Sequence, residues 1–107
     1  MRIIELDASS WTKVIDFYNA LNTVFGAEEG YASSLDGLLE LLVWDHAFPN
    51  TAYVISPPYT IRIQKTKTLS KDILDEIDLI IRYLLEAREE FRIRRGHDIN
   101  VNMEIVS

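Results

Sequence analysis

Three short stretches of the chain each predict a β-strand, and in the last two of them apolar and polar residues alternate. Residues 2–6 contain Ile3 and two further apolar residues and are predicted to form a short buried strand. Residues 59–65 alternate with a period of two and are rich in β-branched and aromatic residues. Residues 99–105 alternate apolar residues with Asn and Glu, which predicts a last strand with one face in water.

After the first strand, apolar residues return at helical spacing. A helix is predicted from about Trp11, with Asp7 or Ser9 as its cap and Gly26 as its C-terminal stop. We expect its buried face to consist of Trp11, Val14, Ile15, Tyr18, Leu21 and Phe25.

A second helix is predicted from about Ser34 to Trp44, after an acidic connection at residues 27–32. Ser33 and Asp36 have the spacing of a capping box, with Asp36 in place of the usual Glu. The apolar residues predicted to be buried are Leu35, Leu38, Leu39 and Leu42.

A long third helix follows the second strand. Ser70 is its predicted cap, and Leu69 and Leu74 are spaced as a hydrophobic staple. Its predicted buried face is Ile73, Ile77, Ile80, Ile81, Leu84 and Leu85. The basic residues Arg92, Arg94 and Arg95 are interpreted as complementing the helix dipole, with a phosphate site as the alternative.

The connections complete the outline. Residues 45–58 are predicted to be irregular, and the residues that break regular structure there are Pro49, Asn50, Pro57 and Pro58. Gly96, His97 and Asp98 are predicted to turn the chain into the last strand. The order of strands and helices therefore predicts an α/β fold: a small, mostly parallel three-stranded sheet flanked by helices, in one domain spanning residues 1–107.

Charge narrows the possible functions. The net charge is -6, and the part of the chain up to Ser56 carries all of this excess. An acidic surface repels nucleic acids and anionic membranes and attracts basic partners. The chain has no cysteine, no predicted signal peptide and no apolar run of the roughly 20 residues that a membrane span needs, so we expect a cytoplasmic protein.

Few side chains are arranged for catalysis. The two histidines, His46 and His97, each adjoin an aspartate, but no third ligand has the spacing of a metal site. Four glycines form no phosphate-binding loop. We therefore expect no enzyme activity, no cofactor and no metal. Asp36 and Glu40 are four residues apart and would share one helix face.

One segment resembles a known family. Residues 31–38 read Tyr-Ala-Ser-Ser-Leu-Asp-Gly-Leu, are followed by Glu40, and are preceded by Phe-Gly-Ala-Glu at residues 25–28. This pattern resembles the barstar family of intracellular ribonuclease inhibitors. Residues 86–88, and a terminal strand ending in Ser107, also fit the family pattern.

The resemblance implies a barstar-like fold and an immunity protein that blocks a basic ribonuclease or toxin nuclease. It implies a monomer that uses carboxylates on the second helix. The partner-binding residues that it implies are Tyr31, Ser34, Asp36, Leu39, Glu40, Trp44 and Glu86.

The chain departs from the family pattern at several of these positions. The family usually has an aromatic residue at Gly30, Gly at Ala32, Asn at Ser34, Trp at Leu39 and Asp at Glu40. These differences support an alternative, a barstar-like scaffold that serves as a non-inhibitory protein-interaction module.

Individual roles also stay open. Asp36 could serve only as a helix cap. Glu40 and Glu86 could be solvated helix residues without a partner. Tyr31 and Trp44 could belong to the core.

Overall fold

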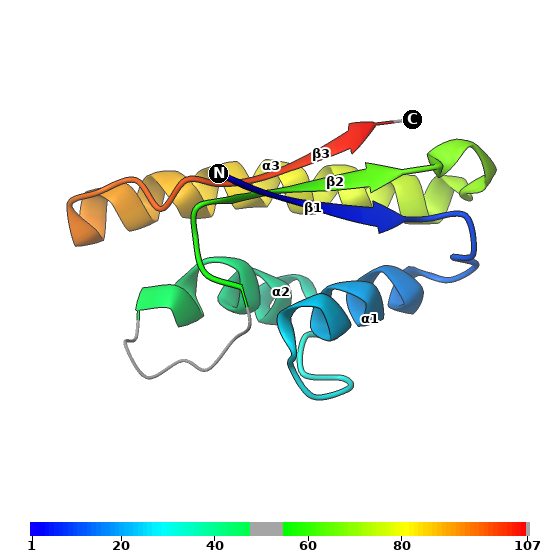
Figure 1. The fold of residues 1–107 in the computed structure, drawn as a ribbon, viewed down its shortest axis with the longest axis horizontal. Coiled ribbons are helices and arrows are strands. Elements are labelled where there is room, and N and C mark those ends of the chain that lie inside the picture. Colours follow the sequence, from blue (N-terminus) through cyan, green and yellow to red (C-terminus); the bar gives the residue numbers. More distant parts are fainter. Residues whose placement is uncertain (48–54, 107) are drawn as a thin grey trace.

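The computed structural model describes residues 1–47 and 55–106. Figure 1 shows a small sheet with helices packed against it. The strands are β1 (Arg2–Asp7), β2 (Tyr59–Gln64) and β3 (Val101–Val106). The helices are α1 (Val14–Phe25), α2 (Leu35–Leu42), the short 3-10 helices η1 (Trp44–Ala47) and η2 (Thr66–Thr68), and α3 (Lys71–Arg95).

The three strands lie in the order β1-β2-β3, and both neighbouring pairs are parallel. This confirms the predicted α/β class. The register aligns Ile4 with Ile61 and Met103, and all three are buried. Because side chains alternate along a strand, the neighbouring positions lie on the other face, which is mostly polar and open to solvent. The sheet is therefore packed on one face, where α3 contacts β3 as well as α1 and α2.

The prediction of a short buried first strand is wrong for one of its three apolar residues. Ile3 is 44% exposed, because its side chain lies on the open face of the sheet. Only the alternate residues Ile4 and Leu6 reach the core. The adjacent apolar residues Ile3 and Ile4 point to opposite faces of the strand, so their sequence predicted burial on both faces, and only one face is buried.

Helix α1 begins at Val14, later than predicted, and neither Asp7 nor Ser9 caps it. The Asp7 carboxylate instead accepts a hydrogen bond from the Ser9 backbone N–H at 2.9 Å and closes a turn. The first helical turn is capped by Asp16, whose Oδ2 accepts the backbone N–H groups of Thr12 at 2.8 Å and Lys13 at 3.0 Å.

The buried face of α1 also differs from the prediction. Trp11 is buried but precedes the helix, and its ring lies 5.6 Å from that of Phe17. Ile15, predicted to be buried, is 40% exposed, whereas Phe17 and Asn22 are buried. Gly26 ends the helix as predicted, in the left-handed conformation with φ 74°.

Helix α2 is shorter than predicted. Its cap is Ser34 and not Ser33, since Ser34 Oγ accepts the Gly37 backbone N–H at 3.3 Å. The helix ends at Leu42, so Trp44 lies in η1. Its fully buried residues are Leu38, Leu41 and Leu42, while the predicted Leu35 and Leu39 are only partly buried.

Helix α3 largely follows the prediction. Ser70 caps it by accepting the Ile73 backbone N–H at 3.4 Å, and Gly96 ends it with φ 79°. The predicted burial of Leu85 is wrong, because this side chain is 59% exposed. Ala87 and Phe91 continue the buried face over the C-terminal half of the helix.

The strand boundaries shift by one or two residues. Strand β2 ends at Gln64 because Lys65 turns the chain with φ 59°, and β3 begins at Val101 after a buried Ile99. The predicted breakers Pro49 and Asn50, and the predicted strand end at Ser107, lie outside the described residues.

Candidate functional site

A buried amide holds the connection between α1 and α2 in place. Asn22 is 1% exposed and exchanges two hydrogen bonds with the Ala32 backbone. Its Nδ2 donates to Ala32 O, and its Oδ1 accepts from Ala32 N, both at 3.0 Å. The amide thus satisfies both backbone groups of a buried residue, as buried polar groups require. This clamp fixes the residues on either side of Ala32, including Tyr31 and the Ser34 cap.

Tyr31 is displayed on the surface by this clamp. Its side chain is 47% exposed, and its hydroxyl donates to Asp45 Oδ2 at 2.7 Å. The bond links the connection before α2 to η1 after it. Tyr31 therefore combines an accessible ring with a hydroxyl of fixed direction, which is a common property of residues that anchor protein interfaces.

The two central carboxylates lie on α2. Asp36 and Glu40 are both exposed and, being four residues apart, lie on the same face of the helix. Asp36 is in the first turn, where the helix dipole favours a negative charge. Within residues 1–47 and 55–106, neither carboxylate forms an ion pair.

Leu39 and Trp44 lie closer to the core. Leu39 is partly buried and packs against the core cluster. The Trp44 ring lies 5.8 Å from the ring of Phe91, and the Arg94 guanidinium carbon is 5.9 Å from the Trp44 ring centroid. Both side chains therefore contribute to packing and keep only part of their surface for a partner.

Glu86 is exposed on α3, which packs against α2. The flank of α3 that faces α1 and η1 is marked by Glu76, which accepts the Tyr18 hydroxyl at 2.7 Å, and by Arg94 beside Trp44. At about 100° per residue, Glu86 lies roughly 80° around the helix from this flank, toward solvent. Glu86 is therefore on a different helix from Asp36 and Glu40, and it lies at the edge of the surface that α2 and α3 share.

We call Glu28, Glu29, Asp36, Glu40 and Asp45 the acidic surface. These five carboxylates belong to α2 and the segments on either side of it, and the sequence from Val14 to Ile61 contains no Lys or Arg. No basic side chain close in sequence neutralises them. From α3, Arg94 lies over the Trp44 ring and Arg95 Nη2 donates to Ala47 O at 3.2 Å, so basic side chains reach η1. A surface with an excess of carboxylates favours encounter with a basic molecule.

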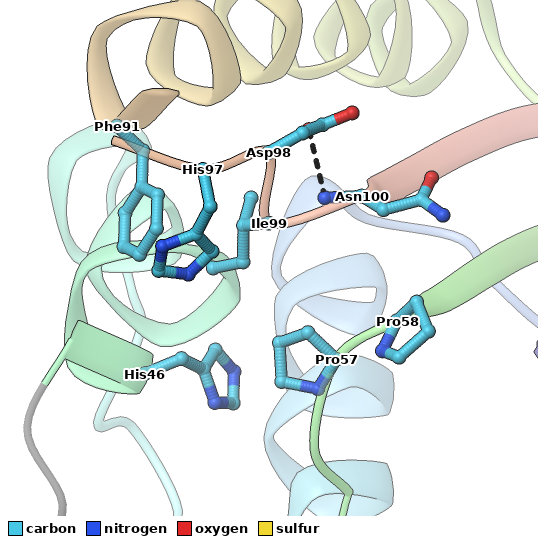
Figure 2. Close-up of a pocket in the computed structure, with 8 residues that line it drawn as sticks. All are labelled: His46, Pro57, Pro58, Phe91, His97, Asp98, Ile99 and Asn100. Atoms are coloured by element: carbon cyan, nitrogen blue, oxygen red, sulfur yellow. Dashed lines mark hydrogen bonds between the residues drawn. The ribbon is translucent and has the colours of Figure 1, made fainter. Parts of the chain in front are cut away.

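The structure also brings the two histidines to one cavity, which the sequence did not indicate. The cavity has a volume of about 470 Å³, and Figure 2 shows that His46 comes from η1 and His97 from the turn after α3. Burial lowers the pKa of His46, although the Asp45 carboxylate beside it acts in the opposite direction.

Asp98 in this cavity is held by other groups. It is bonded to Arg88 Nη2 at 2.6 Å and accepts the Asn100 backbone N–H at 2.9 Å, which lowers its pKa to about 2. In the described parts of the chain, no group of three or more His, Cys, Asp or Glu side chains is placed to hold a metal ion.

Of the predicted site residues, the structure places Tyr31, Ser34, Asp36 and Glu40 along α2 and its N-terminal side. The residue that sequence reasoning missed is Asn22, whose only signal was a polar side chain within an apolar helical stripe. No helix in residues 1–47 or 55–106 is both long and apolar enough to span a bilayer. The chain matches no family model and no curated protein sequence.

Proposed function

We propose that this protein is an intracellular inhibitor of a basic ribonuclease or toxin nuclease. The observation that carries the proposal is the pair Asp36 and Glu40, exposed on one face of α2 and without an ion pair inside the described part of the chain. The similarity of residues 25–42 to the barstar family supports the same function.

The chemistry of a ribonuclease active site explains why carboxylates could block it. A ribonuclease active site is a cationic pocket for phosphate, and a carboxylate accepts the same charge-assisted hydrogen bonds from Arg, Lys or His. Asp36 and Glu40 would take the place of phosphate oxygens. The exposed ring of Tyr31 would pack beside them and exclude water, while Glu86 would add a contact at the rim.

The remaining site residues have supporting roles in this proposal. Ser34 caps α2 and so keeps Asp36 in the first turn. Leu39 and Trp44 would offer the partner the exposed part of their side chains. The other carboxylates of the acidic surface would speed the encounter, and salt would weaken their effect.

The test is a titration of the purified protein into a barnase-type ribonuclease, with RNA cleavage followed at low and moderate salt. We expect stoichiometric inhibition. Removing one partner of a buried, hydrogen-bonded charge pair costs about 2–5 kcal/mol. Glu40→Ala should therefore weaken inhibition about 30-fold or more, whereas Glu29→Ala should change it only a few-fold.

The control measurement is the melting temperature of both variants, which we expect to stay close to that of the wild type because both side chains are exposed. Equal effects of the two variants on inhibition would contradict a site on α2.

A second function, a non-inhibitory protein-interaction module, is favoured by one specific observation. Leu39 and Trp44 both pack against the fold, so the apolar part of the proposed surface is small. An absence of inhibition at micromolar concentration, together with a basic protein captured in a salt-sensitive complex, would support this module over the inhibitor.

A further inference from the structure

The outer edge of β1 carries backbone groups that the fold leaves unpaired. Strand β1 is at the end of the sheet and pairs only with β2. The Ala8 backbone N–H donates to Gln64 O of β2 at 2.9 Å. Successive residues of a strand direct their backbone groups to opposite sides. The N–H and C=O groups of Ile3, Glu5 and Asp7 therefore point away from β2, and no described residue pairs with them.

A groove runs beside this edge. It has a volume of about 440 Å³ and lies between β1 and α1. If an additional strand paired with β1, every second side chain of that strand would point into this groove. The residues that matter for such a strand are the apolar Leu6, Ala20 and Val24 and the acidic Glu5, Asp7 and Asp16.

Two carboxylates of the groove, Asp7 and Asp16, stay ionised. Hydrogen bonds from Ser9 and Lys65 lower the pKa of Asp7 to about 2, and the backbone N–H groups of Thr12 and Lys13 lower that of Asp16. Both groups keep their negative charge over the whole physiological pH range. The groove lining contains no Lys or Arg.

On the open face of the sheet, charges alternate across the strands. Glu104 of β3 lies opposite Arg62 of β2, which lies opposite Glu5 of β1. Arg62 Nε bonds Glu104 Oε1 at 2.7 Å, so its guanidinium is directed to β3. Opposite charges on neighbouring strands stabilise a sheet. The next strand beyond Glu5 would therefore carry a Lys or Arg at this position.

We propose that the outer edge of β1 binds an extended segment of a partner protein in which basic and apolar residues alternate. The segment would extend the sheet by main-chain hydrogen bonds to Ile3, Glu5 and Asp7. Its basic side chains would lie beside Glu5 on the open face, and its apolar side chains would enter the groove over Ala20 and Val24.

A second copy of the chain fits this edge poorly. Two antiparallel β1 edges would place Glu5 and Asp7 near the same carboxylates of the other copy, and each copy has a net charge of -6. The edge shares no residue with the acidic surface around α2, so this proposal is independent of the proposed nuclease inhibition.

The test uses the full-length protein and the peptide acetyl-Lys-Val-Lys-Val-Lys-Val-amide, followed by amide NMR and hydrogen exchange. We expect the peptide to slow the exchange of the Ile3, Glu5 and Asp7 amides. The matched control is acetyl-Lys-Lys-Lys-Val-Val-Val-amide, which has the same composition and charge but no alternation. We expect it to bind about tenfold more weakly or not at all.

Two variants separate charge from backbone pairing. Glu5→Gln removes the cross-strand charge and should weaken binding of the alternating peptide about three- to fivefold. Glu5→Pro removes an N–H that points away from β2 and should weaken binding at least about tenfold. A peptide N-methylated at alternate residues makes the same test on the wild-type protein, without any risk to folding.

Three results would overturn the proposal. The first is equal binding of the two peptides. The second is protection of amides on other elements in place of those of β1. The third is a protein dimer in which the β1 amides are protected without peptide, since this would make a second copy the occupant.

Discussion

The carboxylates around α2 and those along α3 are used in different ways. On α3, Asp75, Glu89 and Glu90 each form an ion pair with a basic residue three or four positions away on the same helix. Around α2, Glu28, Glu29, Asp36 and Glu40 form no ion pair within residues 1–47 and 55–106. Part of the negative charge of α3 is thus balanced within the helix, although Asp72, Asp78 and Glu86 form no ion pair in the described residues. Around α2, none of the four carboxylates is balanced in this way.

This difference indicates what holds each region in place. The α2 region is positioned by uncharged contacts: the Asn22 clamp on Ala32, the Tyr59 hydroxyl bonded to Leu42 O at 2.7 Å, and the buried leucines of α2. In the C-terminal half of α3, Arg88 bonds Asp98 and Asn100 before β3, and its Nη1 donates to Asn102 Oδ1 of β3 itself. Substitutions in the two regions should therefore affect stability and binding differently.

The largest effect on stability should come from Asn22→Ala. The change removes two buried hydrogen bonds and leaves the N–H and C=O of Ala32 unsatisfied, so we expect the free energy of unfolding to fall by about 2–4 kcal/mol. In a domain of this size the melting temperature should fall by about 10 °C or more. Thermal and urea unfolding would measure it.

The matched control is Asn19→Ala on the same helix. Asn19 is only partly buried and makes no side-chain hydrogen bond within the described residues. We expect a change within about 0.5 kcal/mol. Similar losses for the two variants would mean that the clamp does not position the α2 region.

The second effect is that of Arg88→Gln. Arg88 bonds both oxygens of Asp98, at 2.7 and 2.6 Å, and Asn100 Oδ1 at 3.2 Å. Bidentate charged bonds of this kind are strong, but the side chains are 25% and 44% exposed and solvent screens them. We expect a loss of about 1 kcal/mol in urea unfolding.

Arg82→Gln provides the comparison for Arg88. Arg82 is exposed on α3 and has no ion pair in the part of the chain that the structure describes. It should leave stability unchanged. If both variants had the same effect, the Arg88 network would not join α3 to β3.

His46, in η1 after α2, differs from the uncharged contacts that position this region, because its protonation is coupled to folding. It packs against the rings of Phe25 and Tyr59, at 6.2 and 6.1 Å, and burial lowers its pKa. The unfolded chain then binds the proton more tightly than the folded protein. This contribution to stability is complete above the unfolded pKa of about 6.5 and is lost as pH falls below it.

We therefore expect unfolding experiments between pH 8 and pH 5 to show a decline in stability that His46→Gln reduces. The effect should be smaller than that of Arg88→Gln, because the Asp45 carboxylate offsets the burial. An unchanged pH profile in His46→Gln would refute this coupling.

Much of the fold could be predicted because its signals are local. Ser70, Gly26 and Gly96 act at their own helix ends, where one residue type suffices to start or stop a helix. The parallel order of strands follows from their separation by helices. The predictions of helix boundaries and buried residues were wrong where a contact outside the local pattern determined the structure. Trp11 has helical spacing, but the Asp16 carboxylate caps the helix only after it.

The candidate site was predictable to the same extent. Asp36 and Glu40 share a helix face by their spacing alone, so the sequence was sufficient to place them together. The partners of Asn22 and Tyr31, and the approach of His97 to His46, depend on how the chain closes in three dimensions. No local pattern contains that information.

The smallest expected effect is a difference in sign between two charge-removing variants. Asp36 and Glu40 are like charges at i and i+4, which destabilise a helix by about 0.2–0.5 kcal/mol, whereas Glu89 is paired with Arg92. Glu40→Gln should therefore raise the free energy of unfolding by a few tenths of a kcal/mol, and Glu89→Gln should lower it by a similar amount. Urea unfolding at low salt would measure both changes, and both should vanish in about 1 M NaCl, where the Debye length is about 3 Å. Destabilisation by both variants would mean that Glu40 serves the fold. The expected opposite signs would mean that α2 keeps Glu40 at a cost to its own stability, which is the pattern expected of a residue retained for binding.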